Sequence, residues 1–286
     1  MQKILSLNES NNYIIKLLEK NDPFIISRLG IGAETYLSYS YDNKLKLNFN
    51  YLKMLSNNAG IYNINKTLIT YLEQYIECIK NSSALAVFID AIITEQTYFI
   101  NKFNIYAIHY QVIEPFYCCL ENIKPWTHYL INKKVLIISP FITSIQKQLD
   151  NGFQIFKDNN KKIFLDNQQF VFYKSFQTSV GNHIHKDWLE TFTIMCNDIK
   201  NLDFDIALLG CGGYGLPLCN YIKTHMNKSA IYIGGGLQLL FGVMGGRWEN
   251  NQMWKQIIQK NDTKFIKPSG DEIINNYRNI EGGCYW

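Results

Sequence analysis

Arginine is scarce in this 286-residue sequence, because only three of its 28 basic residues are arginines: Arg28, Arg247 and Arg278. Lysine supplies most of the positive charge, so we expect the few arginines where a planar, forked donor is needed for a phosphate or carboxylate. Two of them, Arg28 and Arg247, lie beside glycine clusters. The alternative is that these three arginines are simply what sequence drift has left.

Long apolar runs, paired cysteines and strong net charge are also missing. The longest apolar runs, such as residues 84–89, are far below the roughly 20 residues that cross a bilayer, so no membrane span is predicted. The seven cysteines form no Cys-x-x-Cys pair, which indicates reduced thiols. A net charge of +4, carried by dispersed basic residues, argues against nucleic acid as the main ligand. The first nine residues turn polar before a signal-peptide core could form, so we expect a cytoplasmic protein.

The remaining composition is typical of a folded domain. Hydrophobic residues make up 47% of the chain and charged residues 18%, which is enough apolar surface to form a core. No repeat, low-complexity tract or linker divides the sequence. We therefore expect one domain over residues 1–286.

Strand and helix patterns alternate along the chain. Buried strands are predicted at residues 23–28, 84–90, 133–140, 170–176, 205–209 and 230–233. Helices are predicted at residues 11–20, 63–80, 143–149, 187–202 and 215–225, and a further helix after residue 32. Apolar strands separated by helices indicate an α/β fold, a Rossmann-like and mostly parallel sheet with helices on both faces. Ligands of such sheets bind at the carboxyl ends of the strands.

The sharpest motif is the turn at residues 210–215, Gly-Cys-Gly-Gly-Tyr-Gly, between a predicted strand and a predicted helix. It matches Gly-x-Gly-x-x-Gly, in which the backbone approaches an anionic ligand at a helix N-terminus. A dinucleotide site would need an acidic residue at the end of the next strand, where the sequence has residues 234–236, Gly-Gly-Gly. NAD and S-adenosylmethionine are therefore weaker alternatives. The glycines could also serve helix packing alone.

A second glycine-rich segment spans residues 234–246 and ends at Arg247 and Trp248. So many glycines among large apolar residues are explained if the loop approaches a ligand closely. Arg247 would then offer its guanidinium to a phosphate or an acidic sugar. The alternative is a packing turn with a stacked surface arginine.

A third turn lies near the N-terminus, where a predicted strand runs into Gly30 and Gly32 and then Glu34. Arg28 and Glu34 would both lie at the carboxyl edge of that strand, where chemistry collects in this class of sheet. A structural salt bridge between them is the alternative.

A polar loop at residues 174–187 carries His183, His185 and Asp187 before the most convincing helix. Any of the three could act as a base. The His-x-His pattern is weak evidence for a metal, because no third ligand is identified. Alternatively, Asp187 caps the helix and the histidines are exposed.

These segments together resemble the GT-D-type glycosyltransferases of surface-polysaccharide pathways. The resemblance covers residues 23–60, including FIISRLGIGAE at 24–34, and residues 205–248. It implies a Rossmann-like fold and transfer of a sugar from a nucleotide diphosphate sugar, expected to be a UDP-sugar, to a carbohydrate acceptor. The family's first motif is Arg-Phe-Gly-Asp-Gly-Glu, associated with nucleotide-sugar and metal binding. Here Ile31 stands at the Asp position, and Glu34 matches the Glu only with a shift of one residue.

The resemblance and the turns together define the expected site. Candidate catalytic groups are Glu34 first, then Asp187 and His185. Candidate donor-binding residues are Arg28, Gly30, Gly32, Gly210, Gly212, Gly213, Tyr214, Gly215, Gly235, Gly236, Gln238 and Arg247. No metal is assigned, since one displaced glutamate is a poor site for Mg²⁺ or Mn²⁺; another carboxylate could supply the ligand. A catalytically inactive nucleotide-sugar-binding protein is the main alternative, and a homo-oligomer stays open.

Overall fold

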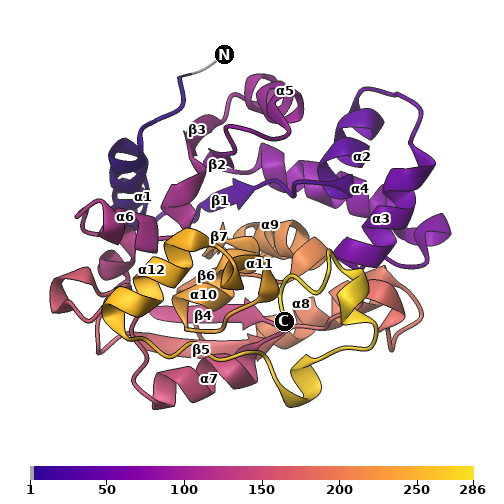
Figure 1. The fold of residues 1–286 in the computed structure, drawn as a ribbon. Helices are drawn as coiled ribbons and strands as arrows, with labels where there is room; N and C mark the ends of the chain where they lie inside the picture. The colour runs from indigo at the N-terminus through magenta and orange to yellow at the C-terminus, as the bar shows by residue number, and fades with distance from the viewer. Residues whose placement is uncertain (1–2) are drawn as a thin grey trace.

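The computed structural model of residues 3–286 is built on one sheet of seven parallel strands (Figure 1). Residues 1 and 2, the start of the segment expected to lack a signal peptide, lie outside the described residues. The strand order is β3-β2-β1-β7-β6-β4-β5. The strands are β1 (Ile25–Arg28), β2 (Ala84–Val87), β3 (Tyr106–His109), β4 (Lys134–Ser139), β5 (Gln169–Lys174), β6 (Ile206–Leu209) and β7 (Ser229–Tyr232). The predicted α/β fold with a Rossmann-like parallel sheet is confirmed.

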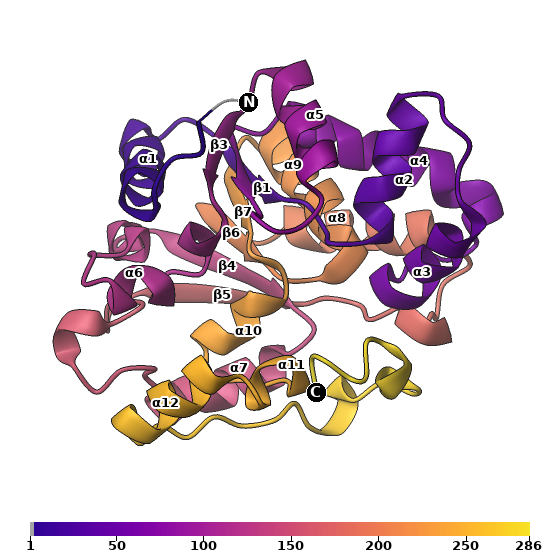
Figure 2. The ribbon, with the colours of Figure 1, turned by 45° about the horizontal axis from the view of Figure 1, so that its top comes forward.

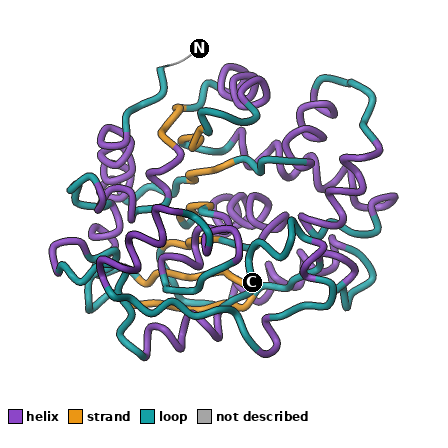
Figure 3. The backbone as a smooth tube through the Cα atoms, viewed as in Figure 1, coloured by secondary structure: helices purple, strands orange, loops and turns teal. Residues whose placement is uncertain are grey.

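Helices cover both faces of this sheet, as Figure 2 and Figure 3 show. One face packs against α2 (Ala33–Asp42), α3 (Phe49–Ala59), α4 (Ile64–Lys80), α5 (Ile93–Phe103), α8 (Trp188–Lys200) and α9 (Gly215–Met226). The other packs against α1 (Leu7–Lys20), α6 (Phe116–Leu120), α7 (Ile142–Asp150), α10 (Leu237–Leu240) and α12 (Gln252–Asn261). A short helix, α11 (Gly246–Glu249), precedes α12.

The inner strands are largely apolar because both of their faces are covered, as in β2 and β6, where every residue is buried. In β6, Ile206 and Leu208 belong to one buried cluster, whereas Ala207 and Leu209 belong to the cluster on the opposite face. Successive side chains of a strand point to opposite faces, so a sheet covered twice needs apolar residues at every position. This is why the central strands could be recognised from the sequence.

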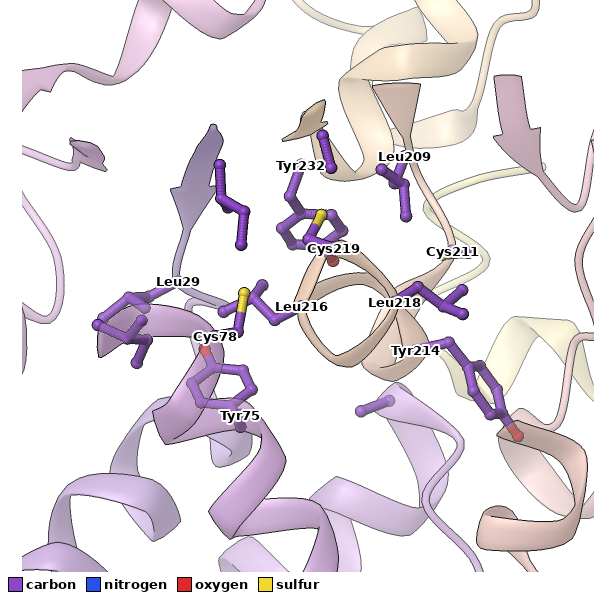
Figure 4. Close-up of a cluster of buried hydrophobic side chains, with 14 of the residues drawn as sticks. Leu29, Tyr75, Cys78, Leu209, Cys211, Tyr214, Leu216, Leu218, Cys219 and Tyr232 are labelled. Carbon is purple, nitrogen blue, oxygen red and sulfur yellow. The ribbon is translucent and has the colours of Figure 1, made fainter. Parts of the chain in front are cut away.

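Helix α9 approaches the sheet closely at its first turn. A Cβ on Gly215 would lie 2.1 Å from the ring of Tyr232 at the end of β7. Figure 4 shows Cys219, one turn further along α9, beside Tyr232, and Leu216 beside the α4 residue Cys78. The last glycine of the 210–215 motif is therefore required for helix packing.

Several boundaries differ from the sequence-based expectation. Helix α1 begins at Leu7 rather than at residue 11, because Ser6 and Glu9 form a reciprocal capping box before the apolar stripe begins. Strand β3 was not predicted at all. It is an edge strand whose first residue, Tyr106, is 56% exposed, and the hydrophobic run that marks it, residues 105–108, is only four residues long. Within residues 3–286, none of the helices has both the length and the apolar character that a membrane crossing requires.

Candidate functional site

A cavity of about 580 Å³ lies at the carboxyl ends of the central strands. Its lining includes Arg28 at the end of β1, Ser139 at the end of β4, Gly210 just after β6 and Tyr232 at the end of β7. This is the edge at which open parallel sheets bind their ligands. All three glycine-rich turns contribute residues to the lining, and Arg28 and Arg247, 219 residues apart in sequence, face the same hollow.

The N-terminal turn is held open toward the cavity by buried hydroxyl groups. The backbone N–H of Gly30 donates to Tyr75 Oη at 3.1 Å, and Thr35 Oγ1 donates to the Gly30 carbonyl at 2.7 Å. A Cβ on Gly30 would lie 2.9 Å from Glu34 Oε1, so a side chain there would collide with the Glu34 carboxylate. Glycine at this position therefore leaves room for the carboxylate of Glu34, which belongs to the first turn of α2.

Arg28 has an unusual environment for a cation. Its guanidinium lies over the ring of Phe88, 5.3 Å from the centroid, and its Nε is buried without a hydrogen-bond partner among the described residues. The ion pairs found within residues 3–286 do not include one between Arg28 and Glu34. The structural salt bridge considered as an alternative is thus not formed. Arg28 faces the cavity with unused donor capacity.

The carboxyl group of Glu34 lines the same cavity. Loss of hydration raises its pKa, the nearby carboxylate of Glu281 acts in the same direction, and the charge of Arg28 opposes both. Glu34 therefore keeps its proton to a higher pH than an ordinary glutamate. A carboxyl group tuned upward in this way is suited to exchange a proton with a bound ligand.

Glu114 does not line the cavity, but its carboxylate acts on the arginines that do, and the sequence did not reveal it. Its carboxylate lies against Gly236, where a Cβ would be only 2.2 Å from Glu114 Oε1. Burial raises its pKa, whereas Arg28 and Arg247 lower it, so its charge acts on both guanidinium groups. Glu114 follows the unpredicted strand β3 and a short 3₁₀ turn, Tyr110–Ile113. The sequence could have pointed to Glu114 only if β3 had been predicted, because that strand places Glu114 near the carboxyl edge of the sheet.

Arg247 reaches the cavity from α11 and is already paired. Its guanidinium forms an ion pair with Glu281 and lies 4.9 Å from the centroid of the Tyr285 ring. Its backbone N–H donates to the carbonyl of Cys284 at 3.0 Å, and that of Gly246 donates to the carbonyl of Trp286 at 2.9 Å. These bonds hold residues 280–286 against the cavity, which Tyr285 and Trp286 line.

The glycines of the 210–215 turn divide into two roles. Gly210, Gly212 and Tyr214 line the cavity, whereas Gly213 and Gly215 do not. A Cβ on Gly213 would lie 2.6 Å from the carbonyl oxygen of Ala59, the last residue of α3, and Gly215 packs on Tyr232 as described above. Gly210 is also needed for packing, because a Cβ there would lie 2.6 Å from the Gly234 carbonyl oxygen. The packing interpretation therefore accounts for Gly213 and Gly215 and in part for Gly210, and close approach to a ligand is available to Gly210 and Gly212.

The second glycine turn, a 3₁₀ turn at Gly234–Gly236, behaves similarly. Gly234 and Gly235 line the cavity, together with Gln238 from α10. Gly236 instead gives room to the Glu114 carboxylate. Gly234 has φ +74°, and a Cβ there would lie 2.7 Å from Arg28 Nη2. This glycine thus lets the backbone of the turn touch the guanidinium.

The structure does not bring the other two candidate catalytic residues to the cavity. Asp187 caps α8, where its Oδ1 accepts a hydrogen bond from the Glu190 N–H at 2.9 Å. His185 Nδ1 lies 2.9 Å from Thr191 Oγ1 and shares a hydrogen bond with it. Neither residue is part of the cavity lining. For Asp187, the capping alternative describes the observed contact.

The cavity offers few ligands for a divalent cation. The carboxylates in its lining are those of Glu34 and Glu281, and Glu281 is paired with Arg247. No group of three or more His, Cys, Asp or Glu side chains arranged to hold a metal ion occurs in the described part of the chain.

The remaining walls combine aromatic rings with uncharged polar groups. The aromatic part includes Phe141, Phe176, Tyr214 and Trp286, and the polar part includes Asn58, Gln177, Thr178 and Ser179. The arrangement can hold an anionic group at Arg28 while ring systems pack against the walls. No protein-family model, curated protein or solved structure matches this chain, so the function has to be inferred from the geometry of the cavity.

Proposed function

We propose that this protein is a glycosyltransferase that binds a nucleoside diphosphate sugar, expected to be a UDP-sugar, in the cavity and transfers the sugar to a carbohydrate acceptor. The observation that carries the proposal is the guanidinium of Arg28, which faces the cavity with a buried Nε that has no partner in the described residues. A buried donor without a partner costs free energy. An anionic ligand would remove that cost, and it would do so most effectively if it presented phosphate oxygens to the planar fork.

A diphosphate fits the distribution of charge better than a single phosphate. Two guanidinium groups from separate turns, Arg28 and Arg247, line one hollow, and Arg247 can exchange its contact with Glu281 for a contact with a second phosphate. A volume of about 580 Å³ lies within the range of ordinary ligand pockets. The aromatic and polar walls suit the nucleoside and the sugar on either side of the diphosphate.

Glu34 is the proposed proton acceptor of the transfer. An acceptor hydroxyl oxygen forms the bond to the anomeric carbon while the bond from that carbon to the diphosphate oxygen breaks. The hydroxyl proton passes to the Glu34 carboxylate, and the electron pair of the broken bond leaves with the diphosphate. Arg28 and Arg247 stabilise the charge that develops on the departing phosphate.

Binding of UDP tests the first part of this proposal. We expect UDP and a UDP-sugar to bind in calorimetry and NAD and S-adenosylmethionine not to bind. Arg28→Met should weaken UDP binding by roughly tenfold to a hundredfold, because a hydrogen bond to a charged group contributes about 1.5–3 kcal/mol. Arg278→Met is the matched control, since this arginine is exposed and outside the cavity lining. Tight binding of NAD without a response to UDP would contradict the proposal.

Turnover tests the second part. Slow hydrolysis of the bound UDP-sugar, or transfer to an added sugar acceptor, should be lost in Glu34→Gln while UDP affinity persists.

The second candidate function is a nucleotide-sugar-binding protein without activity. It is favoured by the sparse carboxylates of the cavity and by Ile31 at the position of the family's aspartate. If the natural protein binds UDP and a UDP-sugar but shows neither hydrolysis nor transfer, with or without Mn²⁺, the second function is correct.

A further inference from the structure

Gln238 is a buried side chain with one polar atom left over. It belongs to α10, lines the cavity and is 1% exposed. Its Nε2 donates to the carbonyls of Val243 at 3.2 Å and Tyr285 at 3.1 Å. Its Oε1 is buried and has no hydrogen-bond partner in the described residues.

The two carbonyl partners determine which way the amide points. A backbone carbonyl only accepts hydrogen bonds, so the atom that faces Val243 and Tyr285 must be the NH₂ group, and an exchange of oxygen and nitrogen would bring oxygen against two oxygens. The oxygen is therefore the free end of the side chain. Buried acceptors in folded proteins nearly always have a partner, so an unpartnered one in a cavity wall needs an explanation.

Gln238 is tied to the same wall that carries the positive charge. The residue whose carbonyl it holds, Tyr285, packs its ring under the guanidinium of Arg247 and against Gly235, where a Cβ would lie 2.4 Å from the ring. Gly235 in turn follows the glycine that touches Arg28. When a phosphate group is held by the two arginines, the ligand atoms next to that phosphate therefore lie beside α10.

We propose that Gln238 Oε1 accepts a hydrogen bond from a ring hydroxyl of the ligand, next to the phosphate group held by Arg28 and Arg247, and that it makes the site selective for hydroxylated sugars. This inference rests on the proposed function. A nucleoside diphosphate sugar carries such hydroxyls on both sides of its diphosphate, on the ribose and on the transferred sugar. Both sources share the same chemistry, a hydroxyl donor a few bonds from a phosphate.

The test compares ligands that lack single hydroxyls. Calorimetry would measure UDP, 2′-deoxy-UDP and 3′-deoxy-UDP for the ribose, and UDP-glucose against UDP-2-deoxyglucose for the transferred sugar. We expect one deoxy ligand to bind the natural protein on the order of tenfold more weakly than its parent, about 1.4 kcal/mol. The same pair should bind Gln238→Met with equal affinity, because the acceptor that distinguishes the two ligands is gone.

Gln148→Met is the matched control. Gln148 is 3% exposed, and its Nε2 also pins two carbonyls, those of Gly242 and Lys264, in the neighbouring loop, but it does not line the cavity. It should keep the full preference for the parent ligand. A merely structural role of Gln238 would lower the affinity for parent and deoxy ligands alike and leave their ratio unchanged.

The outcomes separate this proposal from the one on which it rests. If UDP and UDP-glucose bind but no deoxy ligand binds the natural protein more weakly than its parent, Gln238 has no such role, and the nucleotide site stands. This comparison needs no variant, so it holds even if Gln238→Met does not fold. If neither parent ligand binds, both proposals are wrong.

Discussion

Gly234→Ala should weaken ligand binding through a contact that is visible in the structure. Gly234 has φ +74°, and a Cβ there would lie 2.7 Å from Arg28 Nη2, whereas ordinary contact begins near 3.4 Å. The guanidinium must therefore retreat by about 0.7 Å or swing aside. Positive φ costs a residue other than glycine about 1–2 kcal/mol. Displacement of the fork from a bound phosphate should cost a further 1.5–3 kcal/mol of binding, roughly tenfold to a hundredfold in affinity for UDP.

Gly152→Ala separates these two effects. Gly152 has φ +67° and would place its Cβ in open space, so it carries the same backbone cost without a contact to Arg28. Thermal denaturation should show a fall of a few degrees for both variants, at about 2–4 °C per kcal/mol. Calorimetry with UDP should show a loss only for Gly234→Ala. Equal affinity of the two variants for UDP would refute the claim that Gly234 positions Arg28 for the ligand.

Three further predictions concern packing, charge and capping. Gly215→Ala should lower the free energy of unfolding by about 1–3 kcal/mol, because its Cβ would overlap the buried ring of Tyr232 at 2.1 Å; an unchanged melting temperature would contradict the packing of α9. Burial raises the pKa of Glu34, so the folded state favours its protonated form, and stability is lost as the pH rises through that raised pKa. Glu34→Gln should therefore be more stable than the natural protein at neutral pH, with an advantage that fades toward pH 4.5 and below; denaturant melts over a pH series would reveal a constant difference if this reasoning is wrong. Asp187→Ala should cost about 0.5–2 kcal/mol of stability by removing the cap of α8, with UDP affinity retained, and a loss of affinity at unchanged stability would return this residue to the site.

The central strands were predictable because each of them has to be apolar on both sides. Strands β1, β2, β4, β5, β6 and β7 coincide with the predicted segments to within a few residues at either end. Strands β3 and β5 form the two edges of the sheet. Strand β5 was predicted from its run of large apolar residues at 170–173, whereas the shorter run at residues 105–108, Ile-Tyr-Ala-Ile, was not recognised as a strand.

The site was predicted in part for the same kind of reason. Glycine beside a strand end is a local signal, and the sequence therefore pointed to Arg28, Glu34 and Arg247, which line one cavity. The signal does not say what each glycine makes room for. Gly213 and Gly215 make room for other parts of the protein, and this depends on where α3 and β7 lie in space.

The sequence by itself determined the alternation of strands and helices and the three turns that end at the carboxyl edge, because these follow from side-chain volume and polarity along a short segment. Tertiary structure alone decided that Glu114 acts on both cavity arginines, that Arg247 is paired while Arg28 is not, and that Gln238 keeps a free oxygen. Whether a polar atom has a hydrogen-bond or ion-pair partner depends on residues that lie far away in the sequence. Its electrostatic and hydrogen-bonding energy is set by distances that only the folded chain defines.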